Sequence, residues 1–299
     1  MRELEETAQD EFPFFGCEWA RSLAERSPAF AKQLFPDPRE DDASDDGLER
    51  DPFGEEEGES GCCGLLQRFP DRVLVMVSNA CFMNCRHCTR RWLLRHADVV
   101  RTDEELAACV AYVQERPKVR DVLLSGGDPL VLPDEEVMRF VDSFAGLPQV
   151  DVVRLCTRAP CANPGRVTDA LAAALGASGK VWAQVQFNHA DELTPEAVAA
   201  CGRLVDRGIP VSCQTVMLAG VNDSADAMLD LFRALQRARV RPYYVFMCDP
   251  VAGTGHFQVP VARAKEIAAE CARSIGGLGL PRFVADIPGA DSKTPLEEL

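Results

Sequence analysis

The sequence lacks any run of about 18 apolar residues, the length that a helix needs to cross a bilayer. Residues 1–30 also lack the apolar centre of a secretory signal peptide, because they open on a mainly charged segment. No internal repeat of fixed period is present. We therefore expect a soluble, cytoplasmic protein with no membrane partner.

Positive charge is scarce in this chain. The sequence holds 32 lysine and arginine residues against 47 aspartate and glutamate residues, a formal net charge of −15. Residues 1–60 account for −13 of this charge. An acidic chain binds nucleic acid poorly, so we expect no nucleic-acid partner. We interpret residues 1–63 as an acidic extension, with one or two helices within 19–34 and an exposed, partly disordered connector over 36–59.

Cysteine, in contrast, is abundant, with 13 residues in a chain of 299. The length and the missing signal peptide favour reduced thiols over disulfides. Cys81, Cys85 and Cys88 follow an apolar run with C-x3-C-x2-C spacing. Three thiolates on one loop can bind three irons of a [4Fe–4S] cluster and leave the fourth iron open for a ligand. The alternative is a zinc site that the same thiolates form with His87.

From residue 72 onward, β-rich apolar segments alternate with helical patterns. The expected strands are 73–78, 121–125, 151–156, 180–187, 210–218 and 242–248. The expected helices are 103–116, 133–145, 165–176, 194–207, 223–239 and 260–274. Six β-α units in series predict an α/β fold with a parallel sheet and outer helices.

Two architectures fit six such units, a doubly wound sheet and a partial (β/α)6 barrel of the TIM type. Polar residues follow the carboxyl ends of the expected strands at 81–88, 126–128, 188–189 and 249. Barrel enzymes place their chemistry at that end, so we favour the barrel. We expect it to span residues 64–288, with a separate C-terminal loop over 289–299.

Four further places hold candidate functional residues. Gly126-Gly127-Asp128 is either a strand-to-helix turn or a backbone edge that binds an amino group. Gln214 lies in an otherwise apolar strand, where a buried amide needs partners that a cofactor can supply. Asp249 is either a helix cap or a ligand for a cation. Lys293, one of only five lysines, lies in a loop beyond Asp286 and is either a solvated residue or a Schiff-base lysine.

With these motifs in view, the sequence resembles the lysine 2,3-aminomutase family of pyridoxal-phosphate-dependent adenosyl-radical (radical SAM) enzymes. The similarity covers about residues 64–296. The segments that carry it are Arg68 to Leu74, Cys81 to Arg91, Leu124 to Pro129, Phe187 to His189, Gly220 to Asp223, Arg241 to Tyr244, Gly255 to Phe257 and the loop around Lys293. The resemblance implies a radical SAM barrel.

The resemblance also implies a role for each matching position. The ligands of a [4Fe–4S] cluster would be Cys81, Cys85 and Cys88. S-adenosylmethionine would bind the open iron beside Gly126, Gly127, Asp128 and Gln214. The pyridoxal 5′-phosphate site would contain Arg68, Arg72 and the catalytic Schiff-base lysine Lys293. The amino-acid substrate would contact Arg90 through its carboxylate and Asp249 and Asp286 through its side-chain ammonium.

Together these roles imply an isomerase that interconverts L-lysine and β-lysine through a 5′-deoxyadenosyl radical. Two acids facing one ammonium select lysine, and in glutamate-specific relatives the two positions are not both acidic. The partners implied are a small amino acid and an electron donor of the flavodoxin or ferredoxin type. Two alternatives stay open: the same mechanism on another amino acid such as arginine, and a degenerate barrel that holds metal as an interaction module.

The sequence departs from the family's pattern at several positions. Ala290-Asp291-Ser292 replaces a glycine run before the lysine, and Phe69 and Phe246 replace tyrosines. Gln186 replaces a histidine. The cysteine-rich C-terminal tail of the family is missing, and Ser224 replaces the cysteine that would share its zinc. We therefore expect no structural zinc, and the family's tetramer cannot be assumed, although a homo-oligomer is compatible with the sequence.

Overall fold

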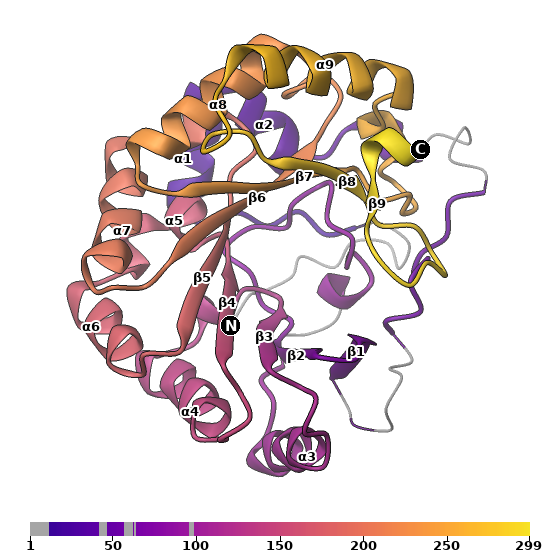
Figure 1. The fold of residues 1–299 in the computed structure, drawn as a ribbon. Helices are drawn as coiled ribbons and strands as arrows, with labels where there is room; N and C mark the ends of the chain where they lie inside the picture. The colour runs from indigo at the N-terminus through magenta and orange to yellow at the C-terminus, as the bar shows by residue number, and fades with distance from the viewer. Residues whose placement is uncertain (1–11, 42–46, 57–61, 63, 96–98) are drawn as a thin grey trace.

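The computed structural model describes residues 12–41, 47–56, 62, 64–95 and 99–299. Its described residues form one curved sheet whose strands are hydrogen-bonded in chain order (Figure 1). The strands are β1 (Leu65–Phe69), β2 (Arg72–Ser78), β3 (Asp121–Gly126), β4 (Val152–Thr157), β5 (Val181–Gln186), β6 (Val211–Met217), β7 (Arg241–Met247), β8 (Arg282–Ala285) and β9 (Thr294–Pro295). Strands β2 to β8 are parallel, whereas β1 and β9 pair antiparallel at the two edges.

Helices follow the parallel strands and cover the outside of the sheet. They are α3 (Asp103–Gln114), α4 (Asp134–Ala145), α6 (Asp169–Ala177), α7 (Pro195–Asp206), α8 (Ala225–Arg237) and α9 (Val261–Ser274), with the short α5 (Ala159–Ala162) after β4. In Figure 1 the six longer helices form an arc around the sheet. The predicted six β-α units are therefore confirmed. The strictly sequential strand order excludes the doubly wound alternative, which requires a reversal of strand order.

Alternation along each strand explains why the sheet has one apolar and one polar face. On β6, Val211, Cys213 and Met217 are buried in the same apolar core as Leu231 and Phe232 of α8. The residues between them, including Gln214, point to the opposite face and stay partly accessible. The outer face thus anchors the helices, and the inner face remains available for a site.

Side-chain caps begin several of the helices. The Thr102 hydroxyl accepts a hydrogen bond from the backbone N–H of Glu105, and the Glu105 carboxylate accepts one from the backbone N–H of Thr102, a capping box at the start of α3. Thr194 caps α7 in front of Pro195, which the first helical turn accommodates because its missing N–H needs no partner there. The residues at the N-termini of α3 and α7 therefore determine where these two helices begin.

The sheet contains three strands that the sequence did not predict, β1, β8 and β9. Each of the edge strands β1 and β9 pairs with a single neighbour among the described residues. The barrel is therefore open along one side, between β1 and β9. The proposed division at residues 63 and 288 stays a prediction.

The N-terminal segment forms two helices, α1 (Glu18–Arg26) and α2 (Pro28–Leu34), which match the predicted range 19–34 except that α1 begins one residue earlier. The expectation of an exposed connector after them is wrong for two acids: the side chains of Glu40 and Glu55 are only 5% and 8% exposed. Glu40 pairs with Arg86 and Glu55 with Arg90, and these ion pairs replace the water that would otherwise solvate the two carboxylates. The rest of the expected connector at 42–46 and 57–59 lies outside the described residues.

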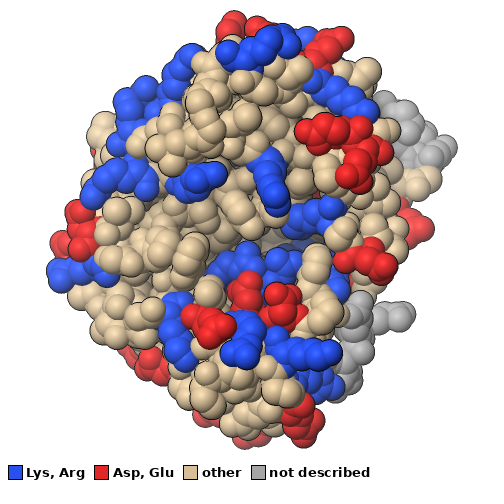
Figure 2. Space-filling view, in the orientation of Figure 1, with Lys and Arg blue, Asp and Glu red and all other residues tan. Residues whose placement is uncertain are grey.

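The surface seen in Figure 2 intermingles basic and acidic side chains around a hollow near its centre. The net negative charge of the chain therefore does not form a surface of one sign on this face. No helix among the described residues is long and apolar enough to cross a membrane.

Candidate active site

Every residue that the sequence placed in the site lines one cavity of about 370 Å³. Its walls come from edge strand β1, the loop after β2, the turn after β3, the middle of β6, and the segments after β7 and β8. The cavity also includes Phe53, Glu55, His87 and Arg158, to which the sequence gave no role in the favoured site. The fold thus brings together residues that are more than 200 positions apart in the chain.

The three cysteines of the loop after β2 all face this cavity. Burial, followed by the neighbouring Cys85, raises the pKa of Cys88 to about 12, so the thiolate form needs a metal at neutral pH. Among the described residues, no three His, Cys, Asp or Glu side chains converge as ligands of a single ion do. The described geometry therefore gives no support to a zinc site with His87, whereas a cubane cluster distributes its cysteines over three irons and fits this donor set.

Residues of the N-terminal segment hold the cysteine loop in place. The backbone of Asn84 donates to the carbonyl of Phe15 at 2.8 Å, and the Asn84 amide donates to that of Pro13 at 2.9 Å. Glu40 forms ion pairs with both Arg86 and Arg91, which flank in sequence the four-residue stretch that contains Cys88. The acidic extension is therefore part of the framework of the site.

The turn after β3 requires its two glycines. A Cβ atom on Gly127 would lie 2.1 Å from the carbonyl oxygen of Ala80, and one on Gly126, which has φ +98°, would lie 2.6 Å from the carbonyl oxygen of Ser78. The N–H groups of Gly127 and Asp128 donate to Ser78 and Ala80. Because these N–H groups are already bonded, a ligand at this turn can use only the carbonyl oxygens of the turn, which are the acceptors that an ammonium group needs.

Asp128 faces the cavity, but its carboxylate is occupied by the protein itself. It accepts hydrogen bonds from the backbone of Leu130, from the Thr157 hydroxyl and from the backbone of Arg158. Its observed function is to hold the end of β4, and a contact with S-adenosylmethionine stays a prediction. The Gln214 amide has no partner among the described residues and fits a cofactor contact better.

Two arginines near the open side of the barrel suit a phosphate. Arg72 stacks on the Phe69 ring at 4.0 Å and forms no ion pair with a described carboxylate. Burial, followed by the nearby Arg154, lowers the pKa of Arg72, and a bound anion would relieve both effects. Arg68 stacks on Phe53 at 4.5 Å. The residues present therefore fit the phosphate group of pyridoxal phosphate.

Lys293 is not a solvated lysine. Its Nζ lies 3.0 Å and 2.9 Å from the two carboxylate oxygens of Asp286 and 4.5 Å from the centre of the Phe246 ring. Asp249 is close by and accepts a hydrogen bond from Thr89. Burial raises the pKa of Asp249 to about 6, opposed by Thr89 and assisted by the negative charge of Asp286. Two acids and one alkylammonium thus share one end of the cavity.

Arg90, predicted to bind the substrate carboxylate, already binds a carboxylate of the chain. Its Nε and Nη2 donate to the two oxygens of Glu55 at 2.6 Å and 3.0 Å. Arg68 lies 3.4 Å from the same carboxylate. This two-pronged geometry is the one that arginine forms with an amino-acid carboxylate, so Arg90 is positioned for that group.

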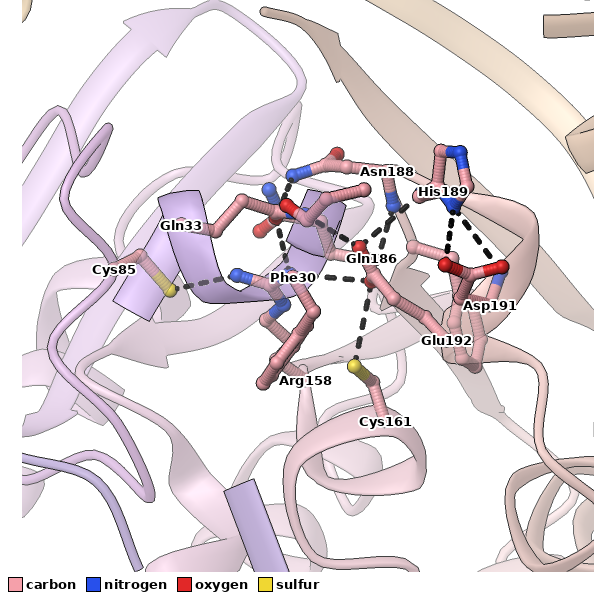
Figure 3. A network of polar contacts seen from close by, with 12 residues as sticks. Phe30, Gln33, Cys85, Arg158, Cys161, Gln186, Asn188, His189, Asp191 and Glu192 are labelled. Carbon is pink, nitrogen blue, oxygen red and sulfur yellow. Dashed lines mark hydrogen bonds and ion pairs between the residues drawn. The ribbon is translucent and has the colours of Figure 1, made fainter. Parts of the chain in front are cut away.

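Sequence reasoning missed the buried polar network behind the cysteine loop (Figure 3). Its members come from α2, the segment after β4 that includes α5, and the segment after β5: Gln33, Arg158, Cys161, Asn188 and Glu192. A signal was available, because Thr157 and Arg158 are polar residues that directly follow the expected strand 151–156. Nothing in the sequence marked Gln33, Glu40 or Glu55.

Comparisons with known proteins agree with this geometry. A family model described as the radical SAM superfamily matches residues 75–232. The L-lysine 2,3-aminomutase of Acetoanaerobium sticklandii is 41% identical over 248 residues, which cover 83% of this chain and 60% of that protein. The glutamate 2,3-aminomutase of Clostridioides difficile is 35% identical over 252 residues, which cover 84% of this chain and 60% of that protein.

Among solved structures, a radical SAM methyltransferase from Sphaerobacter thermophilus matches with a TM-score of 0.55 at 18% identity, covering 76% of this chain and 69% of that one. A likeness at that identity shows the fold alone. The chain spans about 60% of the length of the two aminomutases above. By sequence and fold, the chain belongs to the radical SAM superfamily and, within it, to the lysine 2,3-aminomutase family.

Proposed function

We propose that the protein is a radical SAM, pyridoxal-phosphate-dependent 2,3-aminomutase that interconverts L-lysine and β-lysine. The observation that carries the choice of lysine is the ammonium group of Lys293 held between the oxygens of Asp286, with Asp249 beside it. This end of the cavity is built for an alkylammonium, which is the group at the end of a lysine side chain.

The cavity walls provide a place for each cofactor. Cys81, Cys85 and Cys88 would hold the [4Fe–4S] cluster, with S-adenosylmethionine between it and Gln214. Arg68, Arg72 and Lys293 would hold pyridoxal phosphate. When bound, the cluster and S-adenosylmethionine together supply hydrogen-atom abstraction by a 5′-deoxyadenosyl radical, and pyridoxal phosphate supplies a ring through which the amino group migrates.

The chain's own residues orient the substrate in this scheme. Arg90 binds its α-carboxylate with a two-pronged contact, and the two acids bind its side-chain ammonium. With pyridoxal phosphate bound, Lys293 would be the residue that holds the cofactor, and Asp286 would then be free to accept the ammonium of the substrate. A glutamate side chain would leave two carboxylates facing a third, which disfavours the substrate named for the C. difficile relative.

An anaerobic assay tests this function. Reconstituted protein is supplied with lysine, S-adenosylmethionine, pyridoxal phosphate and dithionite in place of the flavodoxin- or ferredoxin-type donor that we propose, and β-lysine is followed by mass spectrometry. We expect β-lysine to form, and to disappear in Cys85→Ala and in Lys293→Ala. The exposed Lys118 provides the matched control, because Lys118→Ala leaves the cavity untouched.

Cleavage of S-adenosylmethionine without β-lysine would contradict the substrate but keep the radical chemistry. Arginine and glutamate would then be supplied in turn. Absence of both cleavage and iron would contradict the proposal as a whole and return the chain to a metal-binding interaction module.

A further inference from the structure

A buried guanidinium contacts one of the three cysteines of the cluster loop. Arg158 lies directly after β4, and its side chain is 7% exposed. Its Nη1 donates to the Cys85 sulfur at 2.9 Å, and its Nη2 donates to Gln33 at 2.6 Å and to Glu192 at 3.1 Å (Figure 3). One arginine therefore links the cysteine loop to two buried acceptors.

The surroundings of Arg158 leave its guanidinium one orientation. Asp128 fixes its backbone N–H at 2.7 Å, and the Phe30 ring lies 5.4 Å from the guanidinium carbon. Glu192 is fully buried and also accepts from the Gln33 amide at 2.7 Å and from the backbone N–H of Asn188 at 3.1 Å. Because each acceptor is itself held by other donors, rotation of Arg158 away from Cys85 would break several buried hydrogen bonds.

The charges of this network matter for a metal group at Cys85. Arg158 and Glu192 compensate each other as a buried ion pair, but they lie at different distances from the sulfur. The positive group touches it, and the negative group lies on the far side of the guanidinium. A cysteine thiolate at this position is thus next to a fixed hydrogen-bond donor.

We propose that Arg158 sets the reduction potential of the [4Fe–4S] cluster by hydrogen-bonding the ligand sulfur of Cys85, with Gln33 and Glu192 as positioning residues. Reduction adds one electron to the cluster and breaks no bond, so the reduced state carries one more negative charge. A donor on a ligand sulfur stabilises that state more than the oxidised one, which raises the potential. This inference rests on the cluster ligands of the proposed function and not on its substrate.

A redox titration followed by electron paramagnetic resonance tests the inference. The midpoint potential of the reconstituted cluster is measured without S-adenosylmethionine or lysine, on samples matched for iron content. We expect Arg158→Gln to shift the midpoint to more negative values. Arg158→Lys, which keeps the charge but not the forked donor, should shift it less.

Glu192→Gln makes the test sharper, because removal of the negative charge should shift the midpoint in the opposite direction, to more positive values. General loosening of the loop cannot give opposite signs. Arg166→Gln is the matched control, because Arg166 is also held by backbone carbonyls and one acid, away from the cysteines. Its midpoint should equal that of the parent protein.

An unchanged midpoint in both Arg158→Gln and Glu192→Gln would overturn the inference and leave a purely structural network. Shifts of the same sign in both variants would also overturn it. If Arg158→Gln does not take up iron, Arg158→Lys and Glu192→Gln still decide the question by the signs of their shifts. Failure of lysine turnover alone would leave this inference standing, so the two proposals fail separately.

Discussion

Asp249 is a residue whose ionisation costs stability. Burial and the nearby Asp286 raise its pKa to about 6 in the folded protein, against 3.8 for an ordinary aspartate. The folded state therefore binds this proton more tightly than the unfolded state does, and stability is lost as the pH rises through that interval. Two pKa units correspond to about 3 kcal/mol once the pH is above 6.

We predict that Asp249→Asn stabilises the protein without cofactors at pH 8, by about 2 kcal/mol, because asparagine keeps the Thr89 hydrogen bond and removes the buried charge. The advantage should shrink as the pH falls toward 4. Urea unfolding at the two pH values measures it. An equal effect at both would contradict the raised pKa.

The same residue should control the pH dependence of substrate use. In the proposed function, Asp249 becomes neutral as the pH falls through about 6 and would hold the ammonium of lysine less well. We expect kcat/KM for lysine to fall there, and Asp249→Asn to lose that part of the profile together with its preference for lysine over neutral amino acids. Steady-state kinetics between pH 5.5 and 8 check this; a fall that persists in the variant would assign it to another group.

At this scale the sequence predicted residues whose chemistry is visible in their type and place. Cysteines, an isolated lysine and acids at strand ends stand out from their neighbours, and the structure brings them to one cavity. Glu55 and Glu40 could not be recognised, because each is one acid among many in residues 36–59. Only the folded chain places them beside arginines.

At the scale of elements, the N-terminal segment acts on the cysteine loop chiefly through Glu40. Its carboxylate is buried and shared by Arg86 and Arg91. We predict that Glu40→Ala lowers the free energy of unfolding by about 3–5 kcal/mol, because it leaves two buried guanidinium groups without a counter-charge. Denaturant unfolding measures this change.

Asp37 provides the control for that variant. It pairs with Arg39 at the surface, so Asp37→Ala should change the same free energy by less than about 1 kcal/mol. Equal effects of the two substitutions would mean that the buried pairs do not hold the loop.

Glu55 belongs to the same segment and has a different consequence. Its carboxylate occupies Arg90, so in the proposed function an incoming amino acid would have to displace it. We predict that Glu55→Gln lowers KM for the amino acid by about fivefold, equivalent to ~1 kcal/mol of weakened competition. Glu56→Gln, which alters a surface pair with Arg50, is the control. A raised KM in Glu55→Gln would show that the acid supports Arg90 instead of competing for it.

The elements that the sequence predicted are those with a long, regular pattern. The six strands from β2 to β7 each have six or seven residues, and a helix of nine or more residues lies between each of them and the next strand. The strands that it missed are shorter: β1 has five residues, β8 four and β9 two. Such segments become strands only because an existing sheet edge offers hydrogen-bond partners, which no local pattern records.

At the scale of the whole molecule, the open side of the barrel separates two parts of one site. Arg68 lies in β1 at one edge of the sheet, and Lys293 directly precedes β9 at the other. Among the described residues, the first and last strands are joined by no backbone hydrogen bonds.

A cofactor bound through its phosphate at β1 and through its aldehyde carbon next to β9 would cross-link the two edge strands, which no backbone hydrogen bond joins among the described residues. Amide hydrogen exchange should then slow at both edges, and not at β4 or β5, when pyridoxal phosphate is added. In Lys293→Ala the cofactor has no covalent anchor beside β9, so the amide exchange rate of β9 should stay unchanged when pyridoxal phosphate is added. On this view, the open side of the barrel between β1 and β9 is bridged by a vitamin derivative and not by a further strand.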